Sequence, residues 1–315
     1  MPRNPEPLAP WILLAAATIL LALPSAGRAD QSGWTPESSD LLFTSSRDGN
    51  ADVFVLKAGQ RERTNLTKHP SGDNWPVWSP DGERIVFQSR RAGSLDIWVM
   101  KADGSSPSQL TTDPDSDYLP AWTSDGKQVF FTSWRRESGD TVRAPHLYVM
   151  NADGSGQRRL VAASLETSAG ATPSPDGKRI VYSRKTPADG ADILLADIDG
   201  KNERPLTKEK DLYNGTPIFS PDGSWIAFYA DDGKSSALVV MQADGSGRRT
   251  VLSEGQNWYP RWSPDSKWLV YTASAPGGGE ANTDILAIPI TGAGKPVPLA
   301  GSASRELEAS WRPKP

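Results

Sequence analysis

Polar and aromatic side chains that could bind a ligand recur ahead of six similar points of the chain. Five residues before each recurring, mostly aromatic position stands an acid, an amide or a serine; these are Asp73, Asp117, Ser168, Asn214, Asn257 and Glu306. Their neighbours differ from copy to copy: Asn74, Trp75, Tyr118, Trp258, Tyr259 and Glu308. Because packing within a repeat calls for similar residues in every copy, this irregularity favours a binding surface of aromatic anchors with polar neighbours.

Two kinds of function fit these residues. The first is a non-catalytic module that binds a protein through the aromatic anchors. The second is a carbohydrate-active lyase or hydrolase, with an acid and a base drawn from four carboxylates: Asp73, Asp117, Glu306 and Glu308. Such a pair needs a defined separation and one raised carboxyl pKa, which sequence cannot supply. A purely structural interpretation also stays open, in which Trp75 and Trp258 only cover hydrophobic layers. The binding module is our prediction.

Metal and nucleophile chemistry has little support in the composition. The 315 residues include no cysteine and only two histidines, His69 and His146, so thiolate sites are excluded and histidine sites are disfavoured. The chain has no G-x-S-x-G pentapeptide that would mark a serine hydrolase. Alternating aspartates at 113, 115 and 117 resemble part of a calcium loop, but we prefer a solvated acidic loop. We therefore expect no metal and no cofactor.

One repeated phrase organises the chain into modules. In its fullest form it reads Pro-x-Trp-Ser-Pro-Asp-Gly, and its aspartates are Asp81, Asp125, Asp176, Asp222 and Asp265. Proline presets the first corner of a turn, and glycine accepts a left-handed conformation after it. Short β-branched and aromatic runs follow, such as 84–89 and 96–100, and suffice for four strands in roughly 45 residues. This pattern is typical of a propeller blade.

The module count predicts an all-β, six-bladed propeller of four-stranded antiparallel blades. Five modules follow the phrase, and an incomplete first module contributes 41–45, 52–56 and 63–67. The segment around Trp311 would supply the missing innermost strand, so that the two chain ends pair and close the ring without an exposed edge. The recurring aromatics are predicted to be core residues: Trp78, Trp122, Phe219, Trp262 and Trp311.

Two further features of the modules have structural interpretations. Insertions at 134–145 and 275–283 fall between the second and third strands and should be surface loops. An aspartate begins most third strands, at 52, 96, 192 and 284, with His146 in the same place of one module. Arginines 47, 90 and 184 precede three of them, so we expect Asp–Arg or Asp–backbone bonds within each blade.

The first residues read as an export signal. The apolar run 11–23 is short for a membrane span, and small residues follow at 27 and 29. We predict a signal peptide at 1–29, a short segment at 30–40 and a propeller at 41–315. The formal charge of −4, from 34 basic and 38 acidic residues, argues against nucleic-acid binding. The expected product is a monomer, periplasmic or secreted, without a membrane span after signal cleavage.

The repeated Trp-Ser-Pro-Asp-Gly, followed by an Ile-x-Phe-x-Ser run and an Asp-Ile-Trp-Val-Met-x-Ala-Asp-Gly-Ser run, resembles the repeat of TolB-type propellers. The resemblance covers about 34–315. It implies a cell-envelope protein that binds a peptidoglycan-associated lipoprotein through its propeller. From the short stretch between the predicted signal peptide and the first strand, we expect no counterpart of the small α/β domain that precedes the propeller in that family. Related propellers occur in prolyl-oligopeptidase-like enzymes and in oligogalacturonate lyases.

Overall fold

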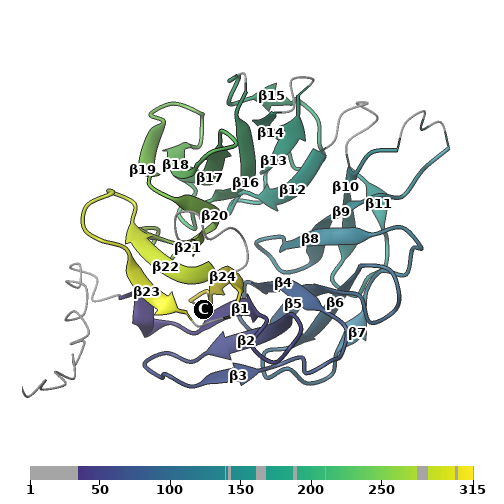
Figure 1. Ribbon diagram of the computed structural model, residues 1–315. Helices are drawn as coiled ribbons and strands as arrows, with labels where there is room; N and C mark the ends of the chain where they lie inside the picture. Colours follow the sequence, from purple (N-terminus) through teal and green to yellow (C-terminus); the bar gives the residue numbers. More distant parts are fainter. Residues whose placement is uncertain are drawn as a thin grey trace, which may run out of the picture.

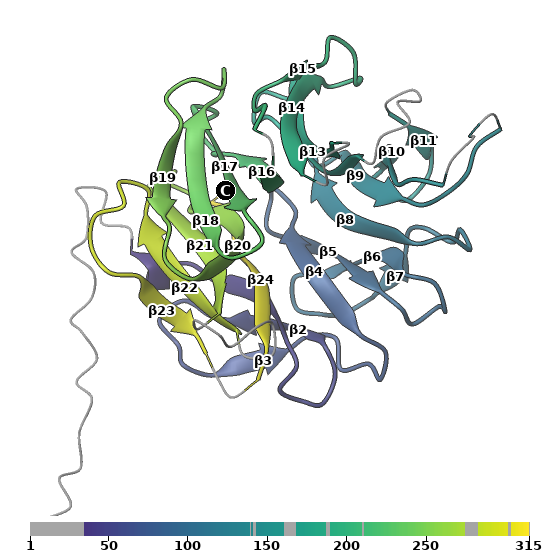
Figure 2. The same cartoon turned by 45° about the horizontal axis from the view of Figure 1, so that its top comes forward.

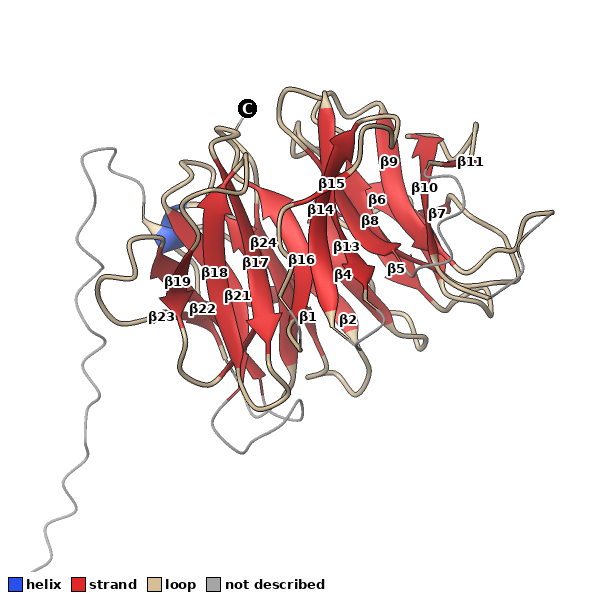
Figure 3. Cartoon of the chain, turned by 90° about the horizontal axis from the view of Figure 1, so that it is seen from above, coloured by secondary structure: helices blue, strands red, loops and turns tan. Residues whose placement is uncertain are grey.

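A computed structural model describes residues 35–138, 140, 143–160, 168–186, 190–209, 211–274, 283–301 and 304–314. The described chain is almost entirely β-structure, with one short 3₁₀ turn, η1, at Pro36–Ser38 (Figure 3). The predicted signal peptide at 1–29 and most of the insertion at 275–283 lie outside the described residues.

The strands form antiparallel groups of four, arranged around a common centre (Figure 1). The first three groups are β24 (Glu306–Trp311) with β1 (Leu41–Ser45), β2 (Asp52–Leu56) and β3 (Arg63–Asn65); β4 (Asp73–Trp78), β5 (Arg84–Ser89), β6 (Asp96–Lys101) and β7 (Ser108–Gln109); and β8 (Asp117–Trp122), β9 (Gln128–Ser133), β10 (His146–Asn151) and β11 (Arg158–Arg159).

Three further groups of four are joined into one sheet by single parallel bridges, Ala191 to Tyr213 and Ser236 to Gln256. They are β12 (Ser168–Pro173), β13 (Arg179–Lys185), β14 (Ala191–Asp197) and β15 (Arg204–Pro205); β16 (Tyr213–Phe219), β17 (Trp225–Asp231), β18 (Ser236–Gln242) and β19 (Arg249–Leu252); and β20 (Gln256–Trp262), β21 (Trp268–Ser274), β22 (Thr283–Pro289) and β23 (Val297–Ala300).

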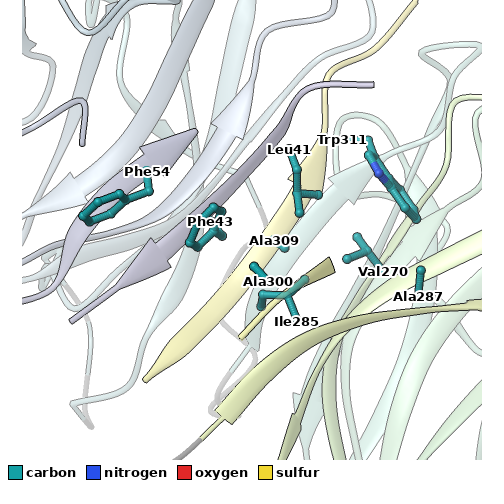
Figure 4. Close-up of a cluster of buried hydrophobic side chains, with 9 residues drawn as sticks. All are labelled: Leu41, Phe43, Phe54, Val270, Ile285, Ala287, Ala300, Ala309 and Trp311. Atoms are coloured by element: carbon teal, nitrogen blue, oxygen red, sulfur yellow. The ribbon is translucent and has the colours of Figure 1, made fainter. Parts of the chain in front are cut away.

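The last strand returns to the first. β24 pairs antiparallel with β1, with Leu41 opposite Trp311 and Ser45 opposite Glu306. Figure 2 shows β24, in yellow, beside the purple strands from the start of the chain. The hydrophobic layer between this group and the group of β20–β23 contains Leu41, Phe43, Val270, Ile285 and Trp311 (Figure 4). The last group in the chain is therefore packed against the first.

The repeated phrase builds the turn between the first two strands of a group. In the first copy, the Ser79 hydroxyl donates to Asp81 Oδ1 at 2.5 Å, and the same Asp81 oxygen accepts the N–H of Glu83 at 3.0 Å. Ser79 Oγ also accepts the N–H of Arg84, at 2.9 Å, where β5 begins. Gly82 has φ +69°, a conformation that favours glycine. The phrase recurs because each of its residues has a task in this turn.

The recurring aromatics are core residues, as the sequence predicts. Each is only 5–6 % exposed and belongs to one of the hydrophobic layers between neighbouring groups; they are Trp78, Trp122, Phe219, Trp262 and Trp311. The indole N–H of Trp262 donates to the Ile218 carbonyl of the preceding group at 3.0 Å. Packing and a hydrogen bond therefore fix the orientation of this ring.

At Asp52, Asp96 and Asp192 the observed partners are side chains of other residues rather than the expected arginine or backbone groups. Asp52 accepts hydrogen bonds from Asn65 and Thr67, at 3.0 Å each. Asp96 and Asp192 each accept one from a threonine near the fourth strand, at 3.3 and 3.0 Å. The hydroxyl is preferred because its backbone is already held beside the third strand by the ladder. Two of the predicted arginines pair with glutamates instead, Arg47 with Glu306 and Arg184 with Glu203.

Candidate functional site

Each inner strand (β4, β8, β12, β16, β20 and β24) runs from what we call the N-terminal face to the C-terminal face. At the N-terminal face, the predicted acids are buried in ion pairs. Asp73 accepts from Arg91 Nη2 at 2.6 Å, and Asp117 accepts from Arg135 Nη2 at 2.5 Å. Both aspartates are 0 % exposed, and burial raises the pKa of each carboxyl more than its arginine lowers it. Both carboxylates therefore have a structural role and are not exposed to a ligand.

The other polar residues at this position are also turned inward. Glu306 is fully buried and pairs with Arg47. Asn214 donates to the Ala191 carbonyl at 3.0 Å, and Asn257 donates to the Ser236 carbonyl at 3.0 Å. The amides thus bond to the third strand of the preceding group where the acids bond to an arginine.

A bulge occurs at the third or fourth residue of every inner strand, around the common centre of the groups, which we call the central channel. The register shifts there, and all six residues have positive φ, from +46° to +68°: Trp75, Leu119, Gly170, Thr216, Tyr259 and Glu308. Five of them are not glycine, so the backbone there carries strain. Four of these residues, Trp75, Leu119, Gly170 and Thr216, line one small cavity.

Aromatic rings fill one side of this channel. Tyr213 stacks on Tyr229 at 6.1 Å between ring centroids, and Tyr229 meets Tyr259 edge-on at 6.0 Å. Tyr259 in turn meets Trp75 edge-on at 4.9 Å. The cavity at the level of the bulges measures only about 10 Å³. The space between the bulges is therefore too small for a ligand.

The surface of the N-terminal face keeps part of the predicted set. Asn74, Tyr118 and Trp258 are partly exposed, whereas Trp75 is 8 % exposed. Tyr213, which sequence reasoning missed, is 41 % exposed. Its place at the start of β16, one residue before Asn214, is the signal that could have found it. This face is an aromatic surface without the acidic ring that the sequence predicts, because those acids are buried.

A larger pocket, of about 390 Å³, opens at the C-terminal face. We call it the proline–tryptophan pocket. Its walls are the recurring aromatics Trp78, Trp122, Phe219, Trp262 and Trp311. Its rim is formed by the residues that follow them in the repeated phrase, namely Pro80, Ser124, Pro175, Pro221, Pro264 and Pro313. The aromatics assigned to the core by sequence thus have a second role in shaping a pocket.

Arg261 lies both in this pocket and at the bulge level below it. Its guanidinium carbon is 5.8 Å from the Trp75 ring centroid, and its Nη1 donates to the Pro260 carbonyl at 3.2 Å. Burial lowers the pKa of Arg261 to about 10, while the negative charge of Glu308 acts in the opposite direction. Sequence reasoning missed Arg261, although the residue before the aromatic is uncharged in the five other copies.

Of the four carboxylates in the hydrolase interpretation, Glu308 is the one that is not paired with an arginine and so most resembles a catalytic acid. It accepts the N–H of Trp75 at 2.7 Å and the hydroxyl of Thr44 at 2.8 Å. Burial raises its pKa in spite of these hydrogen bonds. The other three carboxylates of the hydrolase interpretation, Asp73, Asp117 and Glu306, are held by arginines. Glu308 therefore has no free carboxylate partner among the four.

Three remaining candidates for metal chemistry, Asp113, Asp115 and His146, each contact an arginine. Asp115 binds Arg143 at 2.5 Å, and Asp113 lies 3.5 Å from Arg135, which also holds Asp117. His146 begins β10, and its ring nitrogens lie 2.6 and 2.8 Å from Arg159 Nη2. Across the described ranges, no three potential ligands gather into a metal-binding cluster. Likewise, no helix in that part of the chain has the length and hydropathy to cross a membrane.

The sequence matches the family model of the TolB β-propeller domain, PD40, over residues 24–138 and 91–264. The chain belongs to the TolB β-propeller domain family. The Tol-Pal system protein TolB of Anaeromyxobacter dehalogenans is 32 % identical over 110 residues, which are 34 % of this chain and 24 % of that protein. The match therefore spans about a quarter of that relative.

Solved structures with this fold include TolB from Acinetobacter baumannii, with a TM-score of 0.74, 17 % identity and coverage of 90 % of this chain and 69 % of the other. An oligogalacturonate lyase from Vibrio parahaemolyticus has a TM-score of 0.59 at 14 % identity, covering 84 % of this chain and 75 % of the other. At these identities the likeness concerns the fold alone. For this TolB-family propeller, function has to be argued from the site.

Proposed function

We propose that this protein is a non-catalytic binding module of the cell envelope, and that its partner is a protein docked at the C-terminal face of a closed, six-bladed ring. Six groups of four strands and the pairing of β24 with β1 support the ring. Family membership supports the envelope role, since the relatives carry the name Tol-Pal system protein TolB. By this proposal, residues 1–29 direct the chain to the periplasm and are removed there.

The proline–tryptophan pocket is the observation that carries the proposal. Protein interfaces concentrate their binding energy in aromatic-lined pockets near their centre. This pocket has such walls, sits over the central channel and holds about 390 Å³. Two of its rings also contact arginines, with Arg84 4.6 Å from the Trp122 ring and Arg312 5.1 Å from the Trp78 ring.

The hydrolase interpretation has weaker support. An acid and a base must both face the substrate, and three of the four predicted carboxylates are committed to buried ion pairs.

The partner we propose is a peptidoglycan-associated lipoprotein. The partly exposed aromatics of the N-terminal face, Tyr118, Trp258 and Tyr213, form the alternative contact surface.

A titration of the soluble domain of the same organism's peptidoglycan-associated lipoprotein tests this proposal. Ser124 is an exposed residue on the pocket rim, so Ser124→Trp should block the pocket and weaken binding by at least about tenfold without unfolding the protein. Ala92→Trp, at an exposed position in the loop between β5 and β6, is the matched control and should bind normally.

Trp258→Ala decides between the two faces. If the C-terminal face is the site, this variant binds the lipoprotein domain as the wild type does. If Trp258→Ala weakens binding while Ser124→Trp does not, the site is at the N-terminal face. Calorimetry at protein concentrations of about 100 μM detects binding that is weaker than that of most specific interfaces. If the wild-type protein does not bind the lipoprotein domain under these conditions, the partner assignment is wrong.

A further inference from the structure

Arg261 departs from the pattern of its own repeat. The residue just before the recurring aromatic lines the proline–tryptophan pocket in all six groups, and in the other five it is Val77, Ala121, Thr172, Ile218 or Ser310. Packing between groups is evidently satisfied by small or apolar side chains at this position. Packing between groups therefore does not explain why residue 261 is charged.

The guanidinium of Arg261 lacks a close counter-charge. Among residues of the described ranges, no carboxylate lies within 4 Å of it, and its hydrogen bond to the Pro260 carbonyl uses one nitrogen. Glu308, below it, is held by Thr44 and Trp75. A guanidinium has five N–H donors, so most of the donors of Arg261 remain available at the pocket floor. Burying such a charge without a partner is costly, and a ligand that supplies the partner recovers this cost.

The pocket walls offer few other donors. Five of the six rim positions are prolines, which have no N–H, and the inner strands behind them use their N–H groups in the sheet ladders. Proteins that capture a chain's terminal carboxylate do so with nests of free backbone N–H groups. Here one arginine is the principal donor, and a planar fork of this kind matches a carboxylate in a bidentate arrangement.

We propose that the proline–tryptophan pocket accepts an acidic side chain, aspartate or glutamate, from an apolar loop of a protein partner, and that Arg261 binds its carboxylate. The rings of Trp122 and Trp262 would contact the methylene groups and the apolar neighbours of that side chain. This inference rests on the proposed function, because it names the chemistry of the partner at the same pocket. It makes Arg261 the residue that determines which partner segments fit.

Three short peptides test the inference with the full-length mature protein. The first is Phe-Glu-Phe with both ends blocked, the second is Phe-Gln-Phe with both ends blocked, and the third is Phe-Gln-Phe with a free C-terminal carboxylate. Their affinities are measured by NMR from the indole N–H signals of the protein. We expect the blocked glutamate peptide to bind at least about tenfold more tightly than either glutamine peptide, as a charge-assisted hydrogen bond would provide.

Two matched arginine variants test whether the preference for glutamate over glutamine depends on Arg261. Arg261→Gln should bring the blocked glutamate and glutamine peptides within about twofold of each other, since the charge that discriminates between them is gone. Arg84→Gln removes a guanidinium that lies 4.6 Å from the Trp122 ring but does not line the pocket, and it should leave the preference intact. If Arg261→Gln fails to fold, the wild-type comparison of the three peptides decides alone.

Each other outcome overturns the inference. Equal affinities for glutamate and glutamine peptides, or no binding of any peptide, would show that the pocket does not select acidic side chains. If the peptide with the free C-terminal carboxylate binds most tightly, the ligand of Arg261 is the end of a chain and not an acidic side chain. Titration of the lipoprotein domain separates the two proposals: normal binding to Arg261→Gln leaves the proposed function standing without this inference, whereas a glutamate preference without lipoprotein binding rejects only that partner.

Discussion

At the scale of single residues, one position of the inner strand has two solutions. Where β4 and β8 begin with aspartate, an arginine follows two residues after the serine that ends the second strand, and the pair is buried. Where β16 and β20 contain asparagine, the amide bonds to a backbone carbonyl of the preceding group. A buried charge is tolerated only with its partner, so acid and arginine occur together.

Glu308 should make stability depend on pH. Burial raises its pKa above the ordinary 4.5, so between those two values the folded protein binds more protons than the unfolded chain. The free energy of unfolding therefore falls as pH rises through this window. Glu308→Gln cannot ionise, and its melting temperature should rise relative to that of the wild type between pH 4.5 and pH 8.

Other buried acids with raised pKa, such as Asp73 and Asp117, are present in both proteins and cancel in this difference. Glu83→Gln, at a side chain that is 72 % exposed, is the control and should follow the wild-type curve at every pH. A constant difference between Glu308→Gln and wild type across the range would show that Glu308 ionises as freely in the folded protein as in the unfolded chain.

At the scale of elements, the bulge of the inner strand can be tested where it carries glycine. Gly170 has φ +68°, and a Cβ there would meet only Leu119 Cδ1, at 3.7 Å. Steric room is therefore available, and backbone conformation should decide the effect of a substitution. Gly170→Val should lower the free energy of unfolding in urea by on the order of 1–3 kcal/mol.

Gly170→Asn separates conformation from side-chain size. Asparagine adopts positive φ more readily than a β-branched residue, so this variant should be clearly more stable than Gly170→Val. Equal stability of the two variants would mean that the bulge relaxes when its glycine is replaced. In that case the positive φ of Trp75 and Tyr259 would not represent stored strain either.

Sequence predicts these elements well and the site less well. The Ser-Pro-Asp-Gly turn is local, since Ser79, Asp81 and Arg84 bond within six residues, and local patterns are legible in a sequence. The burial of Asp73 depends on Arg91, eighteen residues away, which follows the strand that pairs with β4. The signal for such an inward acid is the arginine two residues after the serine that ends the second strand, and only a comparison of the copies brings it out.

The sequence contains one signal for the pocket, namely the departure of Arg261 from the repeat. The recurring tryptophans were rightly predicted to be core, but a repeat places such rings around a common centre, where one edge of each can border a cavity. That second role depends on how the groups are arranged around the centre. Arg261 could have been found from the sequence by comparing the residue before the aromatic across the six copies, instead of the residue five places before it.

At the scale of the whole molecule, β24 should be essential for cooperative unfolding. Deleting residues 305–315 removes the neighbour of β1, the Trp311 ring and the partner of Arg47. The inner edge of β1 would then expose unpaired backbone groups. We expect the truncated protein to lose its single sharp transition in calorimetry.

Deleting only 313–315 leaves β24 in place and serves as the control. This shorter truncation should keep a single transition near the wild-type melting temperature. A protein without 305–315 that unfolds in one transition at the wild-type temperature would show that the pairing of β24 with β1 contributes little to the fold.

The pairing of Leu41 with Trp311 also sets an order of events during folding. Every other group is made of four consecutive strands, so its contacts are between near neighbours in the chain and can form early. The group that contains β1 must wait for the last strand. Until then β1, β2 and β3 form an incomplete sheet whose open edge can pair with another chain. The final strand therefore governs both the completion of folding and the time during which the protein is vulnerable to aggregation.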